Sequence, residues 1–177
     1  MAGVLQRHLR WPEAALPLSL ELLSLTQRHG LALWQAVGAL VLGRSQAAGG
    51  DPAGLLPIRQ AASTSAVAMP STEATFLSFL IEALLNLDQA EEALAQIDAC
   101  LPKAHERQEP YLLPELWRMR AQALAAQGAP RADIEQALDK AMQTGQAMGA
   151  ELLLQRSIAQ RQALIKTASS DSTRIQR

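Results

Sequence analysis

An apolar pattern that returns about every forty residues is the strongest constraint on the fold of this chain. Trp34, Phe76 and Trp117 each stand early in an apolar helical run, and they are 42 and 41 residues apart. Each run ends near a turn segment, and an Ala- and Leu-rich helix follows it. Two helices and two turns need about this many residues, so the period is typical of stacked helix pairs. Since each pair buries its apolar face on its neighbours, the stack is predicted to present a surface that binds other molecules.

The composition favours a globular helical chain. The 177 residues suffice for one domain, with 49% hydrophobic and 19% charged residues. Ala and Leu dominate, while the β-branched and aromatic residues that favour strands are sparse. The chain is therefore predicted to be all-α.

The charge and the apolar runs exclude two classes of partner. A net charge of −1 provides no electrostatic footprint for nucleic acid, so binding to nucleic acid is not expected. No apolar run approaches the roughly 18 residues that a membrane span needs, and no signal peptide is evident. The single cysteine, Cys100, indicates a reducing compartment. A cytoplasmic location follows.

Apolar periodicity and the Pro and Gly signals predict about eight helices. Their approximate ranges are 12–28, 31–47, 52–62, 72–87, 89–105, 112–127, 130–144 and 150–166. Asp51 is expected to cap the helix that Pro52 opens, and Ser71 or Thr72 to cap the one that begins at 72. The hydroxyl-rich segment 63–72, with Pro70, is predicted to be a connector.

The helices are assigned to a single domain over residues 1–166. Its first repeat is expected to be incomplete, because MAGVLQRHLRW reads as the end of a helix whose first half is missing. The polar segment 167–177 lacks periodicity and is predicted to be a disordered tail. Ser78, Glu82 and Asn86 form the only polar stripe on the very apolar helix at 72–87, which is therefore expected to be mostly buried.

Three runs carry a resemblance to a known family: PEAALPLSLELLSLTQRHGLALW, DQAEEALAQIDACL and YLLPELWRMRAQALAAQG. They resemble the tetratricopeptide-like (TPR-like) C-terminal helical-repeat region of bacterial ATPase-type signalling regulators, which include adenylate/guanylate cyclase-like proteins and helix-turn-helix transcriptional activators. The resemblance covers roughly residues 12–165. It implies a right-handed α–α superhelix of antiparallel helix pairs. Ala93 and Ala121 match the small residues at which paired helices cross in such repeats, and Gly128 matches the turn glycine.

The resemblance implies a non-catalytic module for protein–protein interaction or ligand sensing. By this reading the chain is the C-terminal part of a larger bacterial signalling or transcriptional regulator. Several departures leave an alternative open, a stand-alone oligomerisation or scaffold module. GRSQAAGG (43–50) has no lysine and follows no strand, so it is not a phosphate-binding loop. No cyclase domain or DNA-reading helix-turn-helix is evident, and the repeat exceeds the usual length of about 34 residues.

No set of residues meets the requirements of an active site or a metal site. His8, His29 and His105 are far apart and fall near helix ends, where the helix dipole favours them. Cys100 shares a helix face with Ala93 and Ile97 and is interpreted as a core residue. Carboxylate pairs such as Glu91 and Glu92 fall in first turns of helices. We therefore predict no enzyme activity, no cofactor and no metal.

Candidate binding residues come from two polar stripes at helical spacing. The apolar helix at 72–87 carries Ser78 and Glu82, and the helix at 112–127 carries Glu115, Arg118 and Gln122. Glu82 would be costly to bury without a partner, so it is expected either to reach a groove or to meet a cation. A Glu82–Arg118 contact would polarise a groove for a peptide or a charged small ligand. Ordinary surface charges are the alternative interpretation.

The partner is predicted to be a protein or a peptide, and self-association is a second possibility. Terminal repeats normally carry a polar cap. An incomplete first repeat would instead expose the apolar face of the helix at 12–28, which invites association. Trp34, Phe76 and Trp117 stand at equivalent repeat positions and are assigned to packing between helices rather than to ligand stacking.

Overall fold

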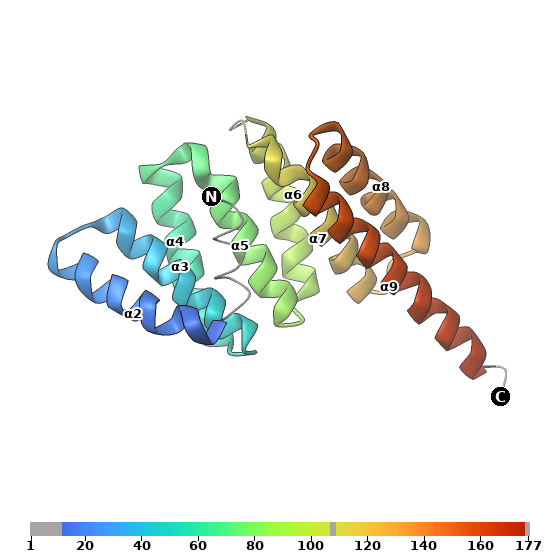
Figure 1. The fold of residues 1–177 in the computed structure, drawn as a ribbon, viewed down its shortest axis with the longest axis horizontal. Coiled ribbons are helices and arrows are strands. Elements are labelled where there is room, and N and C mark those ends of the chain that lie inside the picture. Colours follow the sequence, from blue (N-terminus) through green and yellow to red (C-terminus); the bar gives the residue numbers. More distant parts are fainter. Residues whose placement is uncertain (1–11, 107–108, 176–177) are drawn as a thin grey trace. The chain divides into compact units, whose positions relative to one another are not determined.

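The structure, a computed structural model, describes the backbone of residues 12–106 and 109–175 and the side chains of residues 17–106 and 109–165. Within these ranges the chain forms eight α-helices, three short 3₁₀ turns and no strand (Figure 1). The all-α class predicted from the sequence is therefore confirmed. The expectations for His8 and for an incomplete helix before residue 12 fall outside the described residues.

The helices follow one another at a regular interval. Each helix, or the 3₁₀ turn that leads into it, begins 18 to 21 residues after the previous one. Two such intervals make up the forty-residue period of the sequence. The elements are α2 (Pro12–Arg28), α3 (Ala32–Ala48), η1 (Pro52–Gly54), α4 (Leu55–Ala68), η2 (Pro70–Thr72), α5 (Glu73–Asn86), α6 (Ala90–Glu106), η3 (Pro110–Leu112), α7 (Leu113–Ala126), α8 (Arg131–Ala147) and α9 (Glu151–Ile175).

The chain divides into two compact units, Met1–Glu109 and Pro110–Arg177, where the sequence suggests one domain over 1–166. In the first unit each helix packs against the next one along the chain, and α3 also packs against α5. In the second unit α7, α8 and α9 all pack against one another. Because helices that are consecutive within a unit touch and α3/α5 and α7/α9 touch as alternate helices, the packing within each unit is that of helix-pair repeats.

Helix α5 has the burial that its apolar sequence predicts. Eight of its fourteen residues are buried, and Ile81 and Leu84 have no exposed surface. They share the core of the first unit with Ile58 of α4 and Ile97 of α6, which are also fully buried. In the second unit Leu116, Met119 and Leu138 are at most 1% exposed. Each unit therefore has its own apolar centre.

Two glycines bring α3 and the start of α4 into backbone contact. Gly43 lies inside α3, and a Cβ atom built on it would stand 2.4 Å from the carbonyl oxygen of Gly54. The reverse also holds, because a Cβ on Gly54 would stand 2.2 Å from the Gly43 carbonyl oxygen. Only glycine fits at such a distance, so GRSQAAGG begins with a packing residue, and its first six residues form the end of α3.

The N-terminus of α5 is capped by Glu109, a residue 35 positions away in the sequence. Its carboxylate accepts hydrogen bonds from the backbone amides of Ala74 and Thr75, each at 3.1 Å, and from the Thr75 hydroxyl. Glu109 is only 2% exposed. Thr72, one of the two predicted caps, makes no capping bond from its side chain. The prediction of a local cap is wrong because the buried carboxylate takes the free N–H groups of the first turn.

The predicted cap at Asp51 is confirmed. The Asp51 carboxylate accepts a hydrogen bond from the Ala53 amide at 2.9 Å, and Pro52 follows as the first residue of η1. At the other end of α5, Asp88 adopts a φ of 56°, the left-handed conformation that glycine supplies after most of these helices. Aspartate tolerates this region better than most residues, so the turn forms without glycine.

The connector predicted over 63–72 is mostly helical, since α4 continues to Ala68. The Ser63 and Thr64 hydroxyls donate to the carbonyl oxygens four residues earlier, of Arg59 and Gln60. Ser65 is fully buried, and its hydroxyl lies 2.9 Å from the hydroxyl of Thr72. Hydroxyl side chains that bond back to their own helix do not break it, so the segment needs no loop.

The last helix is longer than the predicted range of 150–166. Helix α9 extends over 25 residues to Ile175, so the backbone of 167–175 continues it. The segment TASSDSTRI contains neither proline nor glycine. Ser, Thr and Asp cost only about 0.5 kcal/mol each relative to alanine inside a helix, which does not stop a helix already under way.

Candidate functional site

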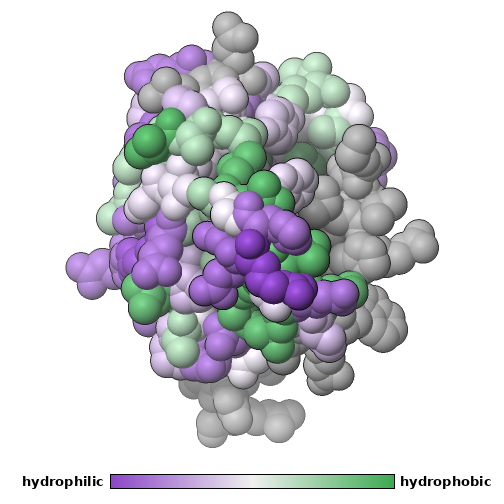
Figure 2. All heavy atoms as spheres, turned by 90° about the vertical axis from the view of Figure 1, so that its left-hand side faces the viewer, coloured by the Kyte–Doolittle hydropathy of each residue, from purple (hydrophilic) through white to green (hydrophobic). Residues whose placement is uncertain are grey.

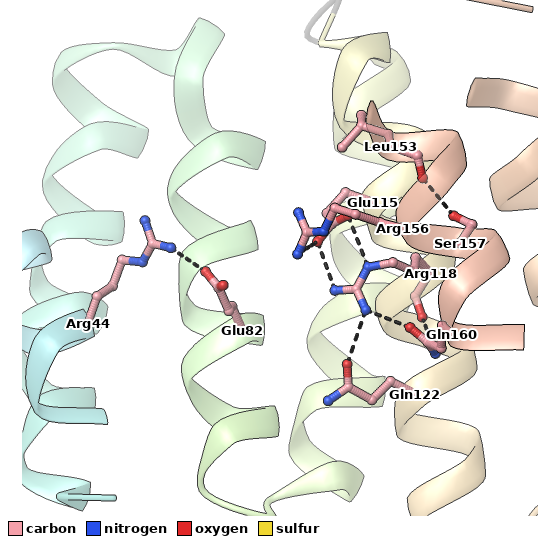
Figure 3. A network of polar contacts seen from close by, with 9 residues as sticks. All are labelled: Arg44, Glu82, Glu115, Arg118, Gln122, Leu153, Arg156, Ser157 and Gln160. Carbon is pink, nitrogen blue, oxygen red and sulfur yellow. Dashed lines mark hydrogen bonds and ion pairs between the residues drawn. The ribbon is translucent and has the colours of Figure 1, made fainter. Parts of the chain in front are cut away.

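Arg118 of α7 is the centre of the most developed polar network in the second unit. Its Nη2 and Nε atoms donate to the two carboxylate oxygens of Glu115, at 2.8 and 3.0 Å. Its Nη1 atom donates to the amide oxygens of Gln122, at 3.3 Å, and of Gln160 on α9, at 2.6 Å. Gln160 donates back to the Arg118 carbonyl oxygen at 3.3 Å (Figure 3). The guanidinium is therefore held rigidly between α7 and α9.

Arg156 of α9 adds a second cation to this network. Its Nη2 atom lies 3.0 Å from Oε1 of Glu115, so that one carboxylate pairs with two guanidinium groups. The side chain of Arg118 is 12% exposed and that of Glu115 is 18% exposed, whereas Arg156 is 39% exposed. Two cations against one anion leave one net positive charge, and the accessible part of it is on Arg156.

We name the set Glu115, Arg118, Gln122, Arg156 and Gln160 the α7–α9 cluster. The three residues predicted on α7 are brought together in it, at spacings of three and four residues. Such an arrangement suits recognition of a carboxylate, because the half-exposed guanidinium of Arg156 has donors beyond its contact with Glu115 and the neighbouring amides can bind a peptide backbone.

The two candidate residues on α5 have different surroundings. Ser78 is buried, and its hydroxyl donates to the Thr75 carbonyl oxygen at 2.7 Å. Glu82 forms an ion pair with Arg44 of α3 (Figure 3). The Arg44 guanidinium also lies 4.2 Å from the centre of the Phe79 ring. Glu82 thus meets a cation, which comes from within the first unit, although its own side chain is 39% exposed and not buried as the sequence suggests.

The expected Glu82–Arg118 contact would join the two units and stays a prediction. Each residue has a charged partner in its own unit, Arg44 for Glu82 and Glu115 for Arg118. Arg44 and Glu115 supply the opposite charges, so neither Glu82 nor Arg118 needs the other as an ion-pair partner.

Three residues of these networks were missed in the sequence: Arg44, Arg156 and Gln160. A signal for two of them exists in the spacing. Arg44 and Glu82 are 38 residues apart, and Arg118 and Gln160 are 42 residues apart, each about one repeat period. In a helix-pair repeat, residues one period apart lie on alternate helices that touch, as α3/α5 and α7/α9 do. Polar residues separated by one period are therefore candidates for pairing.

The three aromatic residues are not equivalent. Helices α5 and α7 begin at Glu73 and Leu113, 40 residues apart, so the counterpart of Phe76 is Leu116. Trp117 is one residue further, a turn of about 100° around the helix. Its ring faces Lys140 of α8, whose Nζ atom lies 4.3 Å from the ring centre. Trp34 is 53% exposed in the first turn of α3. The sequence assigns all three residues to packing between helices. This assignment is confirmed for Phe76, which is buried.

Cys100 of α6 is buried with no exposed surface, and its thiol lies 3.6 Å from the Ala74 carbonyl oxygen. Burial raises the pKa of the thiol from 9.0 to about 12, and the nearby Glu109 adds to the increase. The thiolate is the nucleophilic form, so Cys100 is protonated and inert at neutral pH. This agrees with its assignment to the core.

We expect the Cys100 thiol to react with an aromatic disulfide reagent at pH 8 only after unfolding. The labelling rate should follow the unfolded fraction as urea is added. Because the folded pKa is about 12 and the unfolded value is near 9.0, only the unfolded state loses its proton between these values. Stability is therefore complete below pH 9 and falls as the pH rises above it. Cys100→Ala should lack this part of the decline, and rapid labelling of the folded protein would contradict the burial.

The remaining sequence candidates stay separate. Glu91 and Glu92 lie in the first turn of α6, and Glu92 pairs with Arg59 of α4 at 2.5 Å. Among the described residues, no group of three His, Cys, Asp or Glu side chains is placed to hold a metal ion. No helix in the described ranges is long and apolar enough to cross a membrane.

Comparison with protein-family models, curated proteins and solved structures gives no match to this chain.

Proposed function

We propose that this chain is a non-catalytic helical-repeat module that binds a protein or peptide partner through the α7–α9 cluster. The observation that carries the proposal is the pair of guanidinium groups on one carboxylate. Glu115 and the glutamine amides occupy the donors of Arg118. The Arg156 side chain, in contrast, is 39% exposed and forms one ion pair, with Glu115. The cluster is thus rigid on one side and open on the other.

The chemistry of the cluster selects an acidic ligand. A carboxylate that reaches Arg156 would replace water on a guanidinium that is already oriented, so little side-chain entropy would be lost. Gln122 belongs to the same cluster through Arg118, and its amide can accept or donate a hydrogen bond to a peptide group. The favoured ligand is an extended peptide with an Asp, a Glu or its own C-terminal carboxylate at this point.

The wider setting of the module follows from the resemblance to TPR-like regions. We propose that it belongs to a larger bacterial signalling or transcriptional regulator of the ATPase type and works in the cytoplasm. Binding of a partner or a sensed ligand at the repeat surface would then be passed to the rest of that protein. The period of about forty residues and the contacts between alternate helices support a repeat module.

The test is selection of ligands from a phage-displayed library of random peptides against the whole chain. Enriched peptides should carry a carboxylate, and their affinity should be measured by fluorescence polarisation. Arg156→Glu is expected to weaken binding by about tenfold or more, because it replaces attraction with repulsion. Arg131→Glu is the matched control, since it makes the same charge change on α8 at a side chain that is 69% exposed.

If a selected peptide binds the Arg156→Glu and wild-type proteins with equal affinity, the α7–α9 cluster is not the binding site. Circular dichroism should show unchanged helix content in both variants, so that a loss of binding reports on the surface. Selected peptides without acidic residues would contradict the chemistry proposed for the ligand.

A further inference from the structure

Helix α2 has leucines on its exposed side and hydroxyl groups on its buried side. Leu18 is 61% exposed, Leu20 is 52% exposed and Leu25 is 46% exposed. Ser19 and Thr26 are only 2% and 1% exposed. Figure 2 looks at the side of the molecule on which the α2–α3 turn lies in Figure 1, and apolar side chains reach the surface there between hydrophilic ones. Exposed leucines at this density mark a contact surface.

Contacts with α3 fix this orientation of the helix. The Gln35 amide of α3 donates to the Thr26 carbonyl oxygen at 3.2 Å. The Thr26 hydroxyl is satisfied within α2, since it donates to the carbonyl oxygens of Leu22 and Leu23, at 2.8 and 3.1 Å. Gly38 leaves room for α2, since a Cβ there would stand 3.0 Å from the Leu23 side chain. Rotating α2 to bury Leu18 and Leu25 would break the Gln35–Thr26 hydrogen bond and move Leu23 away from Gly38, so the leucines stay outside.

The same exposed stripe carries one charge of each sign. Leu18, Glu21, Leu25 and Arg28 follow one another at spacings of three, four and three residues, which places them along one side of the helix. Glu21 and Arg28 are both exposed, and neither forms an ion pair within the described part of the chain. They are seven residues apart, about 10 Å along the axis, too far to pair with each other.

We propose that a second copy of this chain docks on α2, with the two α2 helices antiparallel across a twofold axis. A twofold axis midway between Glu21 and Arg28 sets Glu21 opposite Arg28 of the partner subunit, and the reverse pair forms by symmetry. Leu25 lies next to the axis and packs against the partner subunit's Leu25. Both charges of the stripe are paired and Leu25 is covered in one arrangement.

The charge pattern favours a second copy over other occupants. An acidic or basic partner would leave Glu21 or Arg28 facing a like charge, whereas the antiparallel copy matches both. The net charge of −1 also means that two copies repel each other weakly. This surface belongs to the first unit and the α7–α9 cluster to the second, so dimerisation and peptide binding are separable.

Sedimentation velocity of the whole chain, from low micromolar to several hundred micromolar, tests the proposal. The mass should rise with concentration from 19.1 kDa towards twice that value. Glu21→Arg and Arg28→Glu should each weaken the dimer by about tenfold or more, because each replaces two attractive pairs with two repulsive ones. The double variant, with the charges exchanged, should recover the wild-type dissociation constant.

Mixing the two single variants is the sharpest arm of the experiment. Glu21→Arg carries two positive charges on the stripe and Arg28→Glu carries two negative ones, so the mixture should form a heterodimer where neither variant dimerises alone. A chain that stays monomeric at every concentration overturns the proposal. It is equally overturned if the single variants dimerise like the wild type, or if neither the exchange nor the mixture restores association.

Discussion

Gly43→Ala is expected to destabilise the first unit by at least about 2 kcal/mol, although alanine is normally the better helix former. The new Cβ would stand 2.4 Å from the Gly54 carbonyl oxygen and 2.7 Å from the side chain of Ile58. The closer obstacle is backbone, which cannot rotate away as a side chain would. The helix α3 must therefore move from α4, opening contacts in the core.

Gly145→Ala in α8 is the matched control. Gly145 is also a buried glycine inside a helix, but a Cβ there would be 3.5 Å from its nearest neighbour, the Leu154 amide nitrogen, an ordinary contact. This variant should be neutral or more stable by up to about 1 kcal/mol, from helix propensity alone. Urea unfolding followed by circular dichroism measures both. If the two substitutions have the same effect, α3 and α4 are not in backbone contact.

Glu109→Ala is the second large effect, with an expected loss of about 2–3 kcal/mol. The substitution removes the acceptor of the Ala74 and Thr75 amides and of the Thr75 hydroxyl. These donors are at the start of α5, the most buried helix of the first unit, and would lose their partner in a site with little access to water. Glu109→Gln keeps an oxygen but loses the charge that complements the helix dipole, so its effect should be intermediate.

Glu106→Ala serves as the control for Glu109, because Glu106 is exposed near the end of the same segment. It should change the free energy of unfolding by no more than about 0.5 kcal/mol. Amide hydrogen exchange locates the effect, since the exchange of Ala74 and Thr75 should accelerate in Glu109→Ala before that of α6. Unchanged protection of these two amides would show that Glu109 does not cap α5.

Most of the helices could be predicted from the sequence because their signals are local. Asp51 and Pro52 start a helix by capping chemistry that involves only their neighbours. The apolar run at α5 predicts its burial without knowledge of what covers it. The predicted helix boundaries differ from the observed ones where a local signal is ambiguous. The hydroxyls of Ser63 and Thr64 are an example, because such side chains are common in loops but can also bond to the backbone of their own helix.

The candidate site was predictable in part. Glu115, Arg118 and Gln122 share one face of a single helix, which helical spacing reveals. Their partners Arg156 and Gln160 come from another helix, about one repeat away. Pairing Glu82 with Arg44 also required knowing which helices touch. Arg44 comes before Glu82 in the chain, whereas the expected partner, Arg118, comes after it.

The helices, their regular interval and the apolar character of their faces can be read from the sequence alone, because they depend on residues within a few turns of one another. Which polar groups pair depends on how the helices pack. Glu109 caps α5 across 35 positions, and Gly43 matters because the backbone of Gly54 approaches it. Contacts between distant segments depend on which helices pack together and how close their axes are. The spacing of apolar residues within one helix does not specify either.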